Sequence, residues 1–458
     1  MAGQQGRYDV VVIGAGPGGY PAAIRAAQNG LRVACVEREA LGGVCLNWGC
    51  IPSKAIIQAA TLCDKARNKG AEMGIEIPNV AVDMAQLTDW KDGIVRKLTG
   101  GVGQLLKGNG VTVVRGTARL ASANAVEVQT DDGVQTLETA HVVVACGTEV
   151  VSLPDLPTDG EWVLNVRGLL DVRSLPRRLA IVGGGVIGME MGMAYARLGS
   201  EVTVIEFLDE ILSGVDRDCV KWVERRFKKL GGRVMTRSKA AGFELQAGEV
   251  HLRVTAREGG DETTVVCDKV LVAVGFRPNV APLGLEPLGV ALDERGHVRV
   301  DEQLRTSVPN IFAIGDVTGP PYLAHRATKQ GIVAADVIAG KHAAMDVRAM
   351  PAAIFTDPEI AEVGLSEQAA REQGYEPKIA RFPFAALGRA LIYGDKPVPG
   401  LVKLVVDRPS GLLLGAAICG PNASDAINEL AVAIEMGALA EDLALTVHVH
   451  PTIPEAIM

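Results

Sequence analysis

The sequence predicts an α/β fold with two Rossmann-like domains followed by a smaller α+β domain. Three observations carry this prediction. Two segments of the chain match each other at a shift of 169 residues, each with the pattern strand, glycine turn, helix, strand. Abundant valine accompanies 53 glycines, which suits buried parallel strands joined by tight turns. From about residue 348 the pattern changes, and the 458-residue length agrees with about three domains.

The repeated unit begins with an apolar stretch of strand length. The first copy reads YDVVVIGAGPGGYPAAIRAAQNGLRVACVERE and the second reads RRLAIVGGGVIGMEMGMAYARLGSEVTVIEFL. An Ala-rich helical stretch follows the glycines and ends at Gly30 or Gly199, where a glycine C-cap is expected. A second apolar strand then ends in an acid, Glu37 or Glu206.

The glycines have separate physical roles in such a unit. Their positions are Gly14, Gly16 and Gly19 in the first copy, and Gly183, Gly185 and Gly188 in the second. The first glycine makes the tight turn, the second lets the backbone approach a pyrophosphate, and the third lets helix and strand pack closely. The phosphates would lie at the helix N-terminus. Each acid lies 18 residues after its third glycine, where it accepts hydrogen bonds from a ribose.

Two such units predict two dinucleotides in series, for example a flavin and a nicotinamide. Glu206 bears on the choice of nicotinamide because a carboxylate at the ribose 2′ position repels a 2′-phosphate. The next residue is Phe207 and not an arginine. The second site is therefore predicted to select NAD over NADP.

The remaining segments organise around these units. HVVVACGTEV and DKVLVAVGFRPN each indicate a strand that runs into a glycine turn, and TSVPNIFAIGDV indicates a strand that ends at Gly315 and Asp316. GLVKLVVDRPSGLLLGAAICG indicates two strands around a turn, and NASDAINELAVAIEMG indicates an amphipathic helix that ends at Gly437. The predicted parts are a first dinucleotide domain at 1–150, a second at 151–280, a central segment completing the first at 281–347, and an interface domain at 348–458.

Composition excludes several classes of protein. The net charge is −8 and no basic run is present, so nucleic acid is not expected as a partner. No apolar run approaches the ~18 residues that a membrane span needs, and the N-terminus leads almost directly into a strand without a signal-peptide pattern. We therefore expect a cytoplasmic protein. Six of the eight cysteines lie scattered in apolar or helical stretches, as small buried hydrophobes do.

The other two cysteines form a close pair. The stretch GGVCLNWGCIPSK places Cys45 and Cys50 five residues apart. A regular helix would separate them too far for an unstrained disulfide, and Gly49 offers a kink between them. Pro52 suits the first turn of a helix beginning near Cys50, where a thiol has a lowered pKa. This pattern favours a reducible redox disulfide. A structural disulfide, or a metal site completed by His448 and His450, are the alternatives, although no zinc spacing is present.

With these motifs in place, the sequence resembles the flavin-dependent pyridine nucleotide–disulfide oxidoreductases over essentially its whole length. The resemblance is carried, in order along the chain, by VIGAGPGGYPAAIRAA, GGVCLNWGCIPSKA, VGGGVIGME, VAVGFRPN, IFAIGDV with LAHRA, and HVHPTIPEA. Among these, the cysteine block and the C-terminal His-Pro block are the most specific. ACGTEV departs from the family's usual Ala-Thr-Gly-Ser wording, with Cys146 at the altered position.

The resemblance implies a role for each matching residue. FAD would be held by Gly14, Gly16, Gly19, Glu37, Lys54, Gly147, Asp316 and Ala324, with Lys54 at the flavin and paired with Glu190. NAD would be held by Gly183, Gly185, Gly188, Glu190, Glu206 and Gly275. Cys50 would face the flavin and Cys45 would exchange with substrate. His450 would be the acid–base, held by Glu455, with each site shared across a homodimer.

Within the family, the sequence most resembles the members that oxidise dihydrolipoamide with NAD on the lipoyl domains of 2-oxoacid dehydrogenase complexes. The resemblance thus implies a lipoyl domain and the E2 core as partners. A glutathione-reductase-like enzyme should instead prefer NADP and carry a tyrosine where Val186 stands. A mercuric-reductase-like enzyme should add a C-terminal cysteine pair, which the sequence lacks. A flavoprotein with a mainly structural role in a complex is the alternative from another class.

Overall fold

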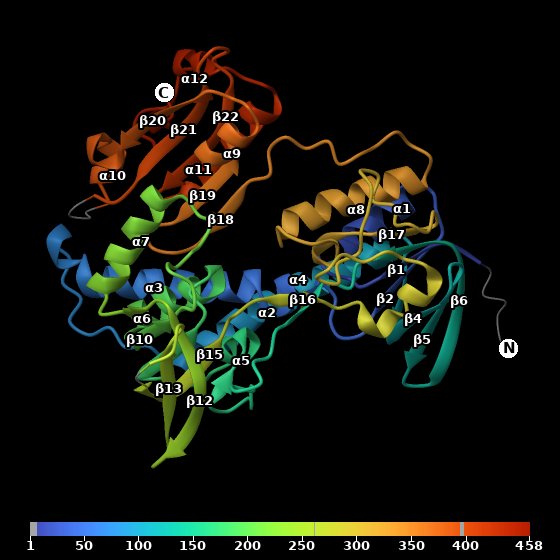
Figure 1. Cartoon of the computed structure of the whole chain (residues 1–458), viewed down its shortest axis with the longest axis horizontal. Coiled ribbons are helices and arrows are strands. Elements are labelled where there is room, and N and C mark those ends of the chain that lie inside the picture. Colours follow the sequence, from blue (N-terminus) through green and yellow to red (C-terminus); the bar gives the residue numbers. More distant parts are fainter. Residues whose placement is uncertain (1–6, 261, 394–397) are drawn as a thin grey trace. The chain divides into compact units, whose positions relative to one another are not determined.

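The computed structural model describes residues 7–260, 262–393 and 398–458. These residues divide into two compact units (Figure 1). The first unit contains Met1–Ser53, Asp89–Val151 and Gly275–Asp346, and the second contains Lys54–Thr88, Ser152–Val274 and Val347–Met458. Among the described residues, no helix has both the length and the apolar character needed to cross a membrane.

A mixed sheet forms the centre of the first unit. Its strand order is β3-β2-β1-β6-β5-β4, and β17 pairs with β6. The strands are β1 (Tyr8–Ile13), β2 (Val33–Glu37), β3 (Thr112–Arg115), β4 (Thr117–Ser122), β5 (Ala125–Thr130), β6 (Gly133–Val144) and β17 (Ile311–Ala313). The pairings among β1, β2, β3, β6 and β17 are parallel, whereas β4, β5 and β6 pair antiparallel. A separate two-stranded ribbon joins β7 (Thr148–Val150) to β16 (Phe276–Pro278).

Helices α1 (Gly19–Gln28) and α8 (Ala324–Ile338) pack against each other beside this sheet (Figure 1). Arg25 of α1 and Asp336 of α8 form a bidentate ion pair, with Nε–Oδ1 and Nη2–Oδ2 distances of 2.8 and 3.0 Å. Small residues such as Ala22 and Ala23 are fully buried on α1. The Ala-rich helix predicted from the first repeat is therefore confirmed, and Gly30 follows its end with φ 85°.

Several short helices complete the first unit. They are α2 (Gly43–Trp48) and the 3-10 turns η2 (Ala281–Leu283), η3 (Glu286–Leu288) and η4 (Gly315–Thr318). Two longer helices, α3 (Cys50–Asn68) and α4 (Met84–Gly108), contribute residues to both units. A 3-10 turn, η1 (Ala71–Met73), lies between these two helices in sequence.

The second unit repeats the βαβ pattern in a parallel sheet of order β11-β10-β9-β15-β8. The strands are β8 (Val163–Leu164), β9 (Arg178–Val182), β10 (Glu201–Ile205), β11 (Arg233–Met235) and β15 (Lys269–Val272). Its helices are α5 (Val166–Leu170), α6 (Val186–Leu198) and α7 (Arg217–Lys229). Helix α6 is buried almost throughout and ends at Gly199, which caps it with φ 122° as predicted. The second unit also contains a three-stranded antiparallel sheet, made of β12 (Ser238–Gln246), β13 (Glu249–Ala256) and β14 (Glu262–Cys267).

The C-terminal part of the second unit is an antiparallel sheet of order β18-β19-β22-β21-β20. The strands are β18 (Ala352–Ile354), β19 (Ile360–Gly364), β20 (Pro377–Pro383), β21 (Leu401–Asp407) and β22 (Leu413–Cys419). The helices are α9 (Glu367–Glu372), α10 (Gly388–Leu391), α11 (Ala423–Glu435) and α12 (Ala440–Leu445), with η5 (Phe384–Ala386) and η6 (Pro454–Ala456) as single turns. The two predicted strands and the amphipathic helix are confirmed as β21, β22 and α11.

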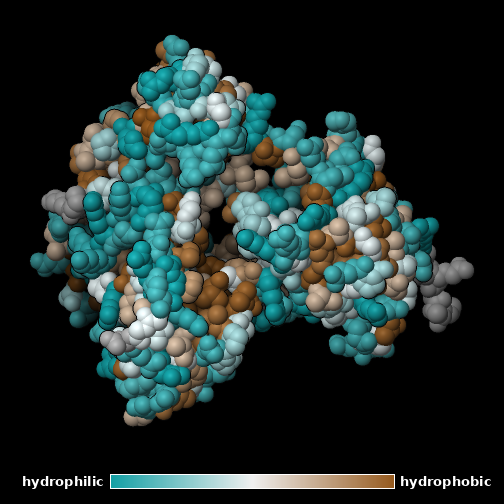
Figure 2. All heavy atoms as spheres, viewed as in Figure 1, coloured by the Kyte–Doolittle hydropathy of each residue, from teal (hydrophilic) through white to brown (hydrophobic). Residues whose placement is uncertain are grey.

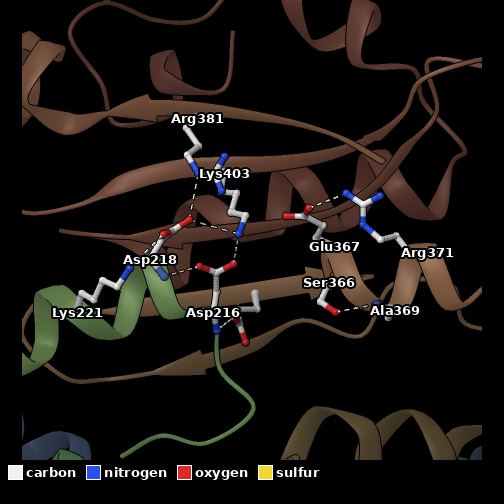
Figure 3. Close-up of polar contacts among 10 residues, drawn as sticks. Asp216, Asp218, Lys221, Ser366, Glu367, Ala369, Arg371, Arg381 and Lys403 are labelled. Atoms are coloured by element: carbon white, nitrogen blue, oxygen red, sulfur yellow. Dashed lines mark hydrogen bonds and ion pairs between the residues drawn. The ribbon is translucent and has the colours of Figure 1, made fainter. Parts of the chain in front are cut away.

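A polar network fastens α7 to this C-terminal sheet (Figure 3). Lys403 of β21 reaches Asp216 at 2.6 Å and Asp218 at 3.4 Å, and Arg381 of β20 reaches Asp218 at 3.0 Å. Glu362 of β19 accepts a hydrogen bond from the backbone N–H of Asp216 at 2.7 Å. Next to this network, Cys219 and Phe227 of α7 pack into a common hydrophobic core with Cys419 of β22. The second βαβ domain and the C-terminal sheet are thereby held together.

Candidate active site

The first glycine turn, between β1 and α1, has the geometry that its spacing predicts. Gly14 has φ 101°, and a Cβ there would lie 2.4 Å from the carbonyl oxygen of Ala145. A Cβ on Gly19 would lie 1.8 Å from the carbonyl oxygen of Gly14. Both positions exclude a side chain because helix and strands approach so closely. A Cβ on Gly16 would meet nothing nearer than 3.9 Å, so the turn leaves open the space where a phosphate would approach the backbone.

The acid at the end of β2 is held in place by the backbone. Glu37 is buried, and its carboxylate accepts hydrogen bonds from the N–H groups of Ala15 and Glu39, each at 2.8 Å. A carboxylate has about four lone-pair sites, so acceptor capacity remains for ribose hydroxyls. The Ala15 contact directs the acid toward the glycine turn.

The second glycine turn reproduces this arrangement between β9 and α6. Gly183 has φ 109°, with the Ala273 carbonyl oxygen 2.4 Å from a would-be Cβ, and a Cβ on Gly188 would lie 1.9 Å from the Gly183 carbonyl oxygen. A Cβ on Gly185 would meet no atom of the described residues within 4 Å. Glu206 follows β10, is buried, and accepts N–H groups of Gly184 and Leu208 at 2.5 and 2.7 Å. Both turns thus fit the pyrophosphate and ribose of a dinucleotide.

The remaining residues predicted to contact cofactors lie at turns. Asp316 is in η4, and burial raises its pKa to about 6, opposed by the nearby Arg326. Ala324 is the first residue of α8. Gly147 and Gly275 have φ values of 65° and 127° at the two ends of the β7–β16 ribbon. The carbonyl oxygen of Gly147 accepts a hydrogen bond from the N–H of Asn279, and that of Gly275 accepts one from the N–H of Val151.

The cysteine pair lies where α2 ends and α3 begins. Gly49 separates these helices with φ −135° and ψ −114°, and a Cβ there would lie 2.8 Å from the carbonyl oxygen of Val44. The predicted kink at Gly49 and the helix start at Cys50 are both confirmed. Cys50 is exposed and Cys45 is partly buried. Burial is the main cause that raises the pKa of Tyr20, and the charge of Cys45 adds to it.

The other cysteines have a different environment. Cys35, Cys63, Cys219, Cys267 and Cys419 are buried, as predicted, whereas Cys146 is half-buried. Burial raises the pKa of Cys35, Cys146 and Cys267 to about 12. Thiols of this kind stay protonated and unreactive, which leaves Cys45 and Cys50 as the candidates for redox chemistry.

Lys54 and Glu190 meet as predicted. The Lys54 Nζ lies 2.7 Å from Oε2 of Glu190, and the carboxylate is almost fully buried. The other carboxylate oxygen accepts the backbone N–H of Phe355 at 2.9 Å. The Phe355 ring lies 4.6 Å from the ammonium nitrogen. The ammonium is therefore held between a carboxylate and an aromatic face.

His450 and Glu455 form the predicted dyad at the C-terminal end. Nδ1 of His450 lies 2.8 Å from Oε1 of Glu455, while Oε2 accepts the backbone N–H of Thr452 at 2.7 Å. The Thr452 hydrogen bond and then His450 lower the pKa of Glu455. The carboxylate is thus anionic near neutral pH and orients an imidazole whose other nitrogen remains available, since the His450 side chain is 79% exposed.

His448 differs from His450 in its surroundings. Its ring is nearly buried, with Nε2 2.7 Å from Glu429 and Nδ1 2.9 Å from the carbonyl oxygen of Thr446. Burial opposes its charged form, but Glu429 and the Thr446 carbonyl raise its pKa overall. With both ring nitrogens engaged, His448 holds the chain in place. Within the described residues, no group of three or more His, Cys, Asp or Glu side chains could hold a metal ion.

One residue of the site was not predicted from the sequence. Phe355 contacts both Lys54 and Glu190. Phe355 is more than 150 residues from either partner in the chain. No local spacing signals such a contact, because the fold alone brings it about.

Comparison with known proteins identifies the family. The family model described as pyridine nucleotide-disulphide oxidoreductase matches residues 8–331, and the model of that family's dimerisation domain matches residues 350–458. Among curated proteins, a dihydrolipoyl dehydrogenase of Geobacillus stearothermophilus is 48% identical, covering 98% of this chain and 94% of its own length. One from Haloferax volcanii is 47% identical with the same coverage.

Solved structures give the same result. The crystal structure of LpdA from Mycobacterium tuberculosis superposes with a TM-score of 0.90 at 29% identity, covering 98% of each chain. The HOCl-induced flavoprotein disulfide reductase RclA from Escherichia coli, in its Cu(II) complex, has a TM-score of 0.87 at 27% identity and covers 99% and 98% of the two chains.

The chain belongs to the pyridine nucleotide–disulfide oxidoreductase family. It is a flavoprotein oxidoreductase whose cofactors are FAD and NAD, and its C-terminal part is the family's dimerisation domain. That domain has exposed apolar side chains of the kind that a homodimer buries, namely Val432, Met436, Leu445, Val447 and Val449. On the face in view in Figure 2, apolar residues of the C-terminal part are interspersed with hydrophilic ones.

Proposed function

We propose that the chain is a dihydrolipoyl dehydrogenase, which oxidises dihydrolipoamide and reduces NAD. The observation that carries this proposal is the identity of 44–48% over 98% of the chain to curated proteins with that name. The contacts of His450 with Glu455 and of Lys54 with Glu190 support it, because they provide a histidine–carboxylate pair for acid–base chemistry and a carboxylate partner for the lysine assigned to the flavin.

In the proposed reaction, Cys45 and Cys50 form a disulfide that accepts two electrons from the substrate dithiol. His450 takes a proton from a substrate thiol, so that the thiolate attacks the sulfur of Cys45, breaks the Cys45–Cys50 bond and releases Cys50 as a thiolate. Glu455 fixes the tautomer of His450 and stabilises its protonated form. A second substrate thiolate then displaces Cys45, leaving a cyclic lipoamide disulfide and two enzyme thiols, with Cys50 on the flavin side. Bound FAD supplies the hydride chemistry that connects this dithiol to NAD.

The cofactor roles follow the two glycine turns. FAD is assigned to a domain at 1–150 completed by 281–347, NAD to 151–280, and dimerisation to 348–458. The residues assigned to FAD are Gly14, Gly16, Gly19, Glu37, Lys54, Gly147, Asp316 and Ala324. Those assigned to NAD are Gly183, Gly185, Gly188, Glu190, Glu206 and Gly275. The room at Gly16 and Gly185 supports both assignments, since among the described residues a Cβ on Gly16 would meet only the Cα of Gly43, at 3.9 Å, and a Cβ on Gly185 would meet nothing within 4 Å.

The proposed partners follow from the family resemblance of the sequence. The substrate is carried on a lipoyl domain, and the enzyme associates with the E2 core of a 2-oxoacid dehydrogenase complex in the cytoplasm. Each active site is completed by His450 and Glu455 of the second copy in the homodimer.

One set of assays tests the proposal. The purified protein should show a flavin spectrum and reduce NAD with dihydrolipoamide. Parallel assays with NADP and with glutathione separate the glutathione-reductase-like alternative. Reduction by NADH without transfer to lipoamide or glutathione would support the mainly structural flavoprotein instead.

A further inference from the structure

Two arginines lie beside the acid of the second βαβ unit. The backbone N–H of Arg237 bonds to the Leu208 carbonyl oxygen at 2.9 Å, and the N–H of Ser238 bonds to the carbonyl oxygen of Glu206 at 2.9 Å. Arg257 follows on the adjacent strand end, with its N–H on the Arg237 carbonyl oxygen and its Nη1 3.4 Å from the Phe207 carbonyl oxygen. The backbone of both arginines therefore lies beside residues 206–208, the loop that is predicted to contact the adenosine ribose.

The guanidinium groups of both arginines are paired with carboxylates. Oδ1 of Asp209 lies 2.8 Å from Nε of Arg237 and 3.2 Å from Nη2 of Arg257. Glu258 lies 2.9 Å from the same Nη2 atom. The Arg257 guanidinium also lies over the Phe207 ring at 5.7 Å. Hydrogen bonding and charge from Arg237, with a smaller share from Arg257, lower the pKa of Asp209. The four charges cancel within this cluster.

Arginine is the side chain best suited to a 2′-phosphate, because its planar fork binds phosphate oxygens in pairs. Arginine near the acid position is the usual feature of NADP sites in this type of unit. The chain thus carries two guanidinium groups of the right chemistry next to an NAD site, yet neutralises both. Glu206 repels a 2′-phosphate, and the pairing of the arginines removes the attraction that would offset this repulsion.

We propose that Asp209 is a specificity-determining residue, which keeps Arg237 and Arg257 from binding the 2′-phosphate of NADP. This inference rests on the assignment of NAD to the second glycine turn. Asp209 and Arg237 are both largely exposed, and exposed pairs are weak and screened by salt. The effect is therefore modest and depends on ionic strength.

The test is a binding experiment on the flavin-loaded enzyme. Dissociation constants for NAD⁺, NADP⁺ and 2′,5′-ADP are measured by calorimetry at low salt for the wild type and for Asp209→Asn. Asp209→Asn should tighten NADP⁺ and 2′,5′-ADP about 3- to 10-fold and leave NAD⁺ within about twofold. Adding salt to about 0.5 M should remove most of this gain.

Glu210→Gln is the matched control, since it also removes one negative charge, at the next position. The Glu210 carboxylate pairs with Arg217, at 3.1 Å, and not with Arg237 or Arg257 in the described contacts. Glu210→Gln should change NADP⁺ binding much less than Asp209→Asn. Arg237→Met added to Asp209→Asn should abolish most of the gain, because Arg257 keeps its contact with Glu258 at 2.9 Å, whereas Arg237→Met alone should change NADP⁺ binding little.

Three outcomes would overturn the inference while NAD⁺ still binds the wild type. These are an unchanged affinity in Asp209→Asn, an equal gain in Glu210→Gln, or a gain that survives Arg237→Met. Failure of NAD⁺ itself to bind the wild type would instead contradict the assignment of the second glycine turn.

Discussion

The ammonium of Lys54 lies 2.7 Å from the buried carboxylate of Glu190, joining α3 to α6. The second oxygen of the same carboxylate accepts the N–H of Phe355, just beyond β18. One side chain therefore links α3, which begins at Cys50, to the residue that follows β18 of the C-terminal sheet. The three groups lie in separate segments of the sequence and depend on one buried charge.

Replacing Glu190 by glutamine should weaken this arrangement. The amide keeps an acceptor for Phe355 but loses the charge that holds Lys54, so turnover should fall about 10- to 100-fold. Glu190→Ala should additionally leave the Phe355 N–H without its acceptor, at a cost of about 1–3 kcal/mol in the free energy of unfolding. Steady-state assays and thermal unfolding separate the two effects.

Lys65→Met is the control for this experiment, because Lys65 is an exposed lysine on the same helix. It should change neither turnover nor unfolding. Wild-type turnover in Glu190→Gln would show that Lys54 needs no carboxylate partner.

The Arg25–Asp336 pair between α1 and α8 predicts a pH dependence of stability. Hydrogen bonding from Arg25 is the largest cause that lowers the pKa of Asp336 from 3.8 to about 2. A carboxyl group with a lower pKa when folded stabilises the protein above its unfolded pKa. That contribution is lost as pH falls from about 4 to about 2.

Asp336→Asn should therefore destabilise the first unit by about 1–2 kcal/mol at pH 7, allowing for the partial exposure of Arg25. The difference from wild type should shrink toward zero near pH 2. Urea unfolding followed at several pH values measures this. A difference that is constant across pH would assign the effect to lost packing instead of charge.

The redox cysteines give a spectroscopic prediction. If Cys50 faces the flavin and Cys45 exchanges with substrate, partial reduction should produce a long-wavelength thiolate–flavin absorption band. Cys45→Ser should keep that band and lose lipoamide turnover at least about a thousandfold, whereas Cys50→Ser should lose the band. Cys146→Ser, at a half-buried cysteine of raised pKa, serves as the control and should keep both. The opposite pattern would exchange the two roles.

Much of the fold was predictable from the sequence because the two βαβ units carry local signals. Gly14 and Gly183 need positive φ, and Gly19 and Gly188 lack room for a Cβ, so sequence spacing reports directly on geometry. The Gly49 break and the Cys50 helix start were predictable for the same reason. The antiparallel strands β4, β5, β12 and β13 were not predicted, although β5 and β13 alternate buried and more exposed residues as half-buried strands do. Their pairing depends on which neighbours the sheet provides, and no local pattern specifies that.

The candidate site was predictable only where the family's motifs mark it. The dyad of His450 and Glu455 lies within one short segment, so its contact follows from local structure. The Phe355 contact joins the residue after β18 to helices α3 and α6, and the pairing of Asp209 with two arginines likewise joins segments that are far apart in sequence. No motif encodes them.

The ion pairs of Lys403 lead to a prediction about the stability of the second unit (Figure 3). Lys403 is buried, and although burial opposes its charge, Asp216 and Asp218 raise its pKa. Lys403→Met leaves two carboxylates without this cation, at a cost of about 2–4 kcal/mol, near the range for breaking a buried pair. Thermal unfolding should show the loss. Lys221→Met, which removes a largely exposed lysine 3.9 Å from Asp218, should cost less than about 0.5 kcal/mol. Equal effects of the two changes would contradict a dominant role for the buried lysine.

The last prediction concerns the sharing of active sites between two copies of the chain. Cys45 and His450 lie at opposite ends of the sequence, and the family resemblance assigns His450 and Glu455 of one copy to Cys45 of the other. Two inactive variants test this, one with Cys45→Ser and one with His450→Gln. They are unfolded and refolded together, and mixed dimers are verified by differently tagged chains.

A mixed dimer with shared sites has one site with both changes and one site with neither. Dihydrolipoamide turnover should then return to about a quarter of the wild-type value in a statistical mixture, because about half of the dimers are mixed and each has one intact site. Refolding each variant alone should restore nothing, which controls for contamination. If every site lay within one chain, each would retain one change, and verified mixed dimers without activity would place His450 in the site of its own chain.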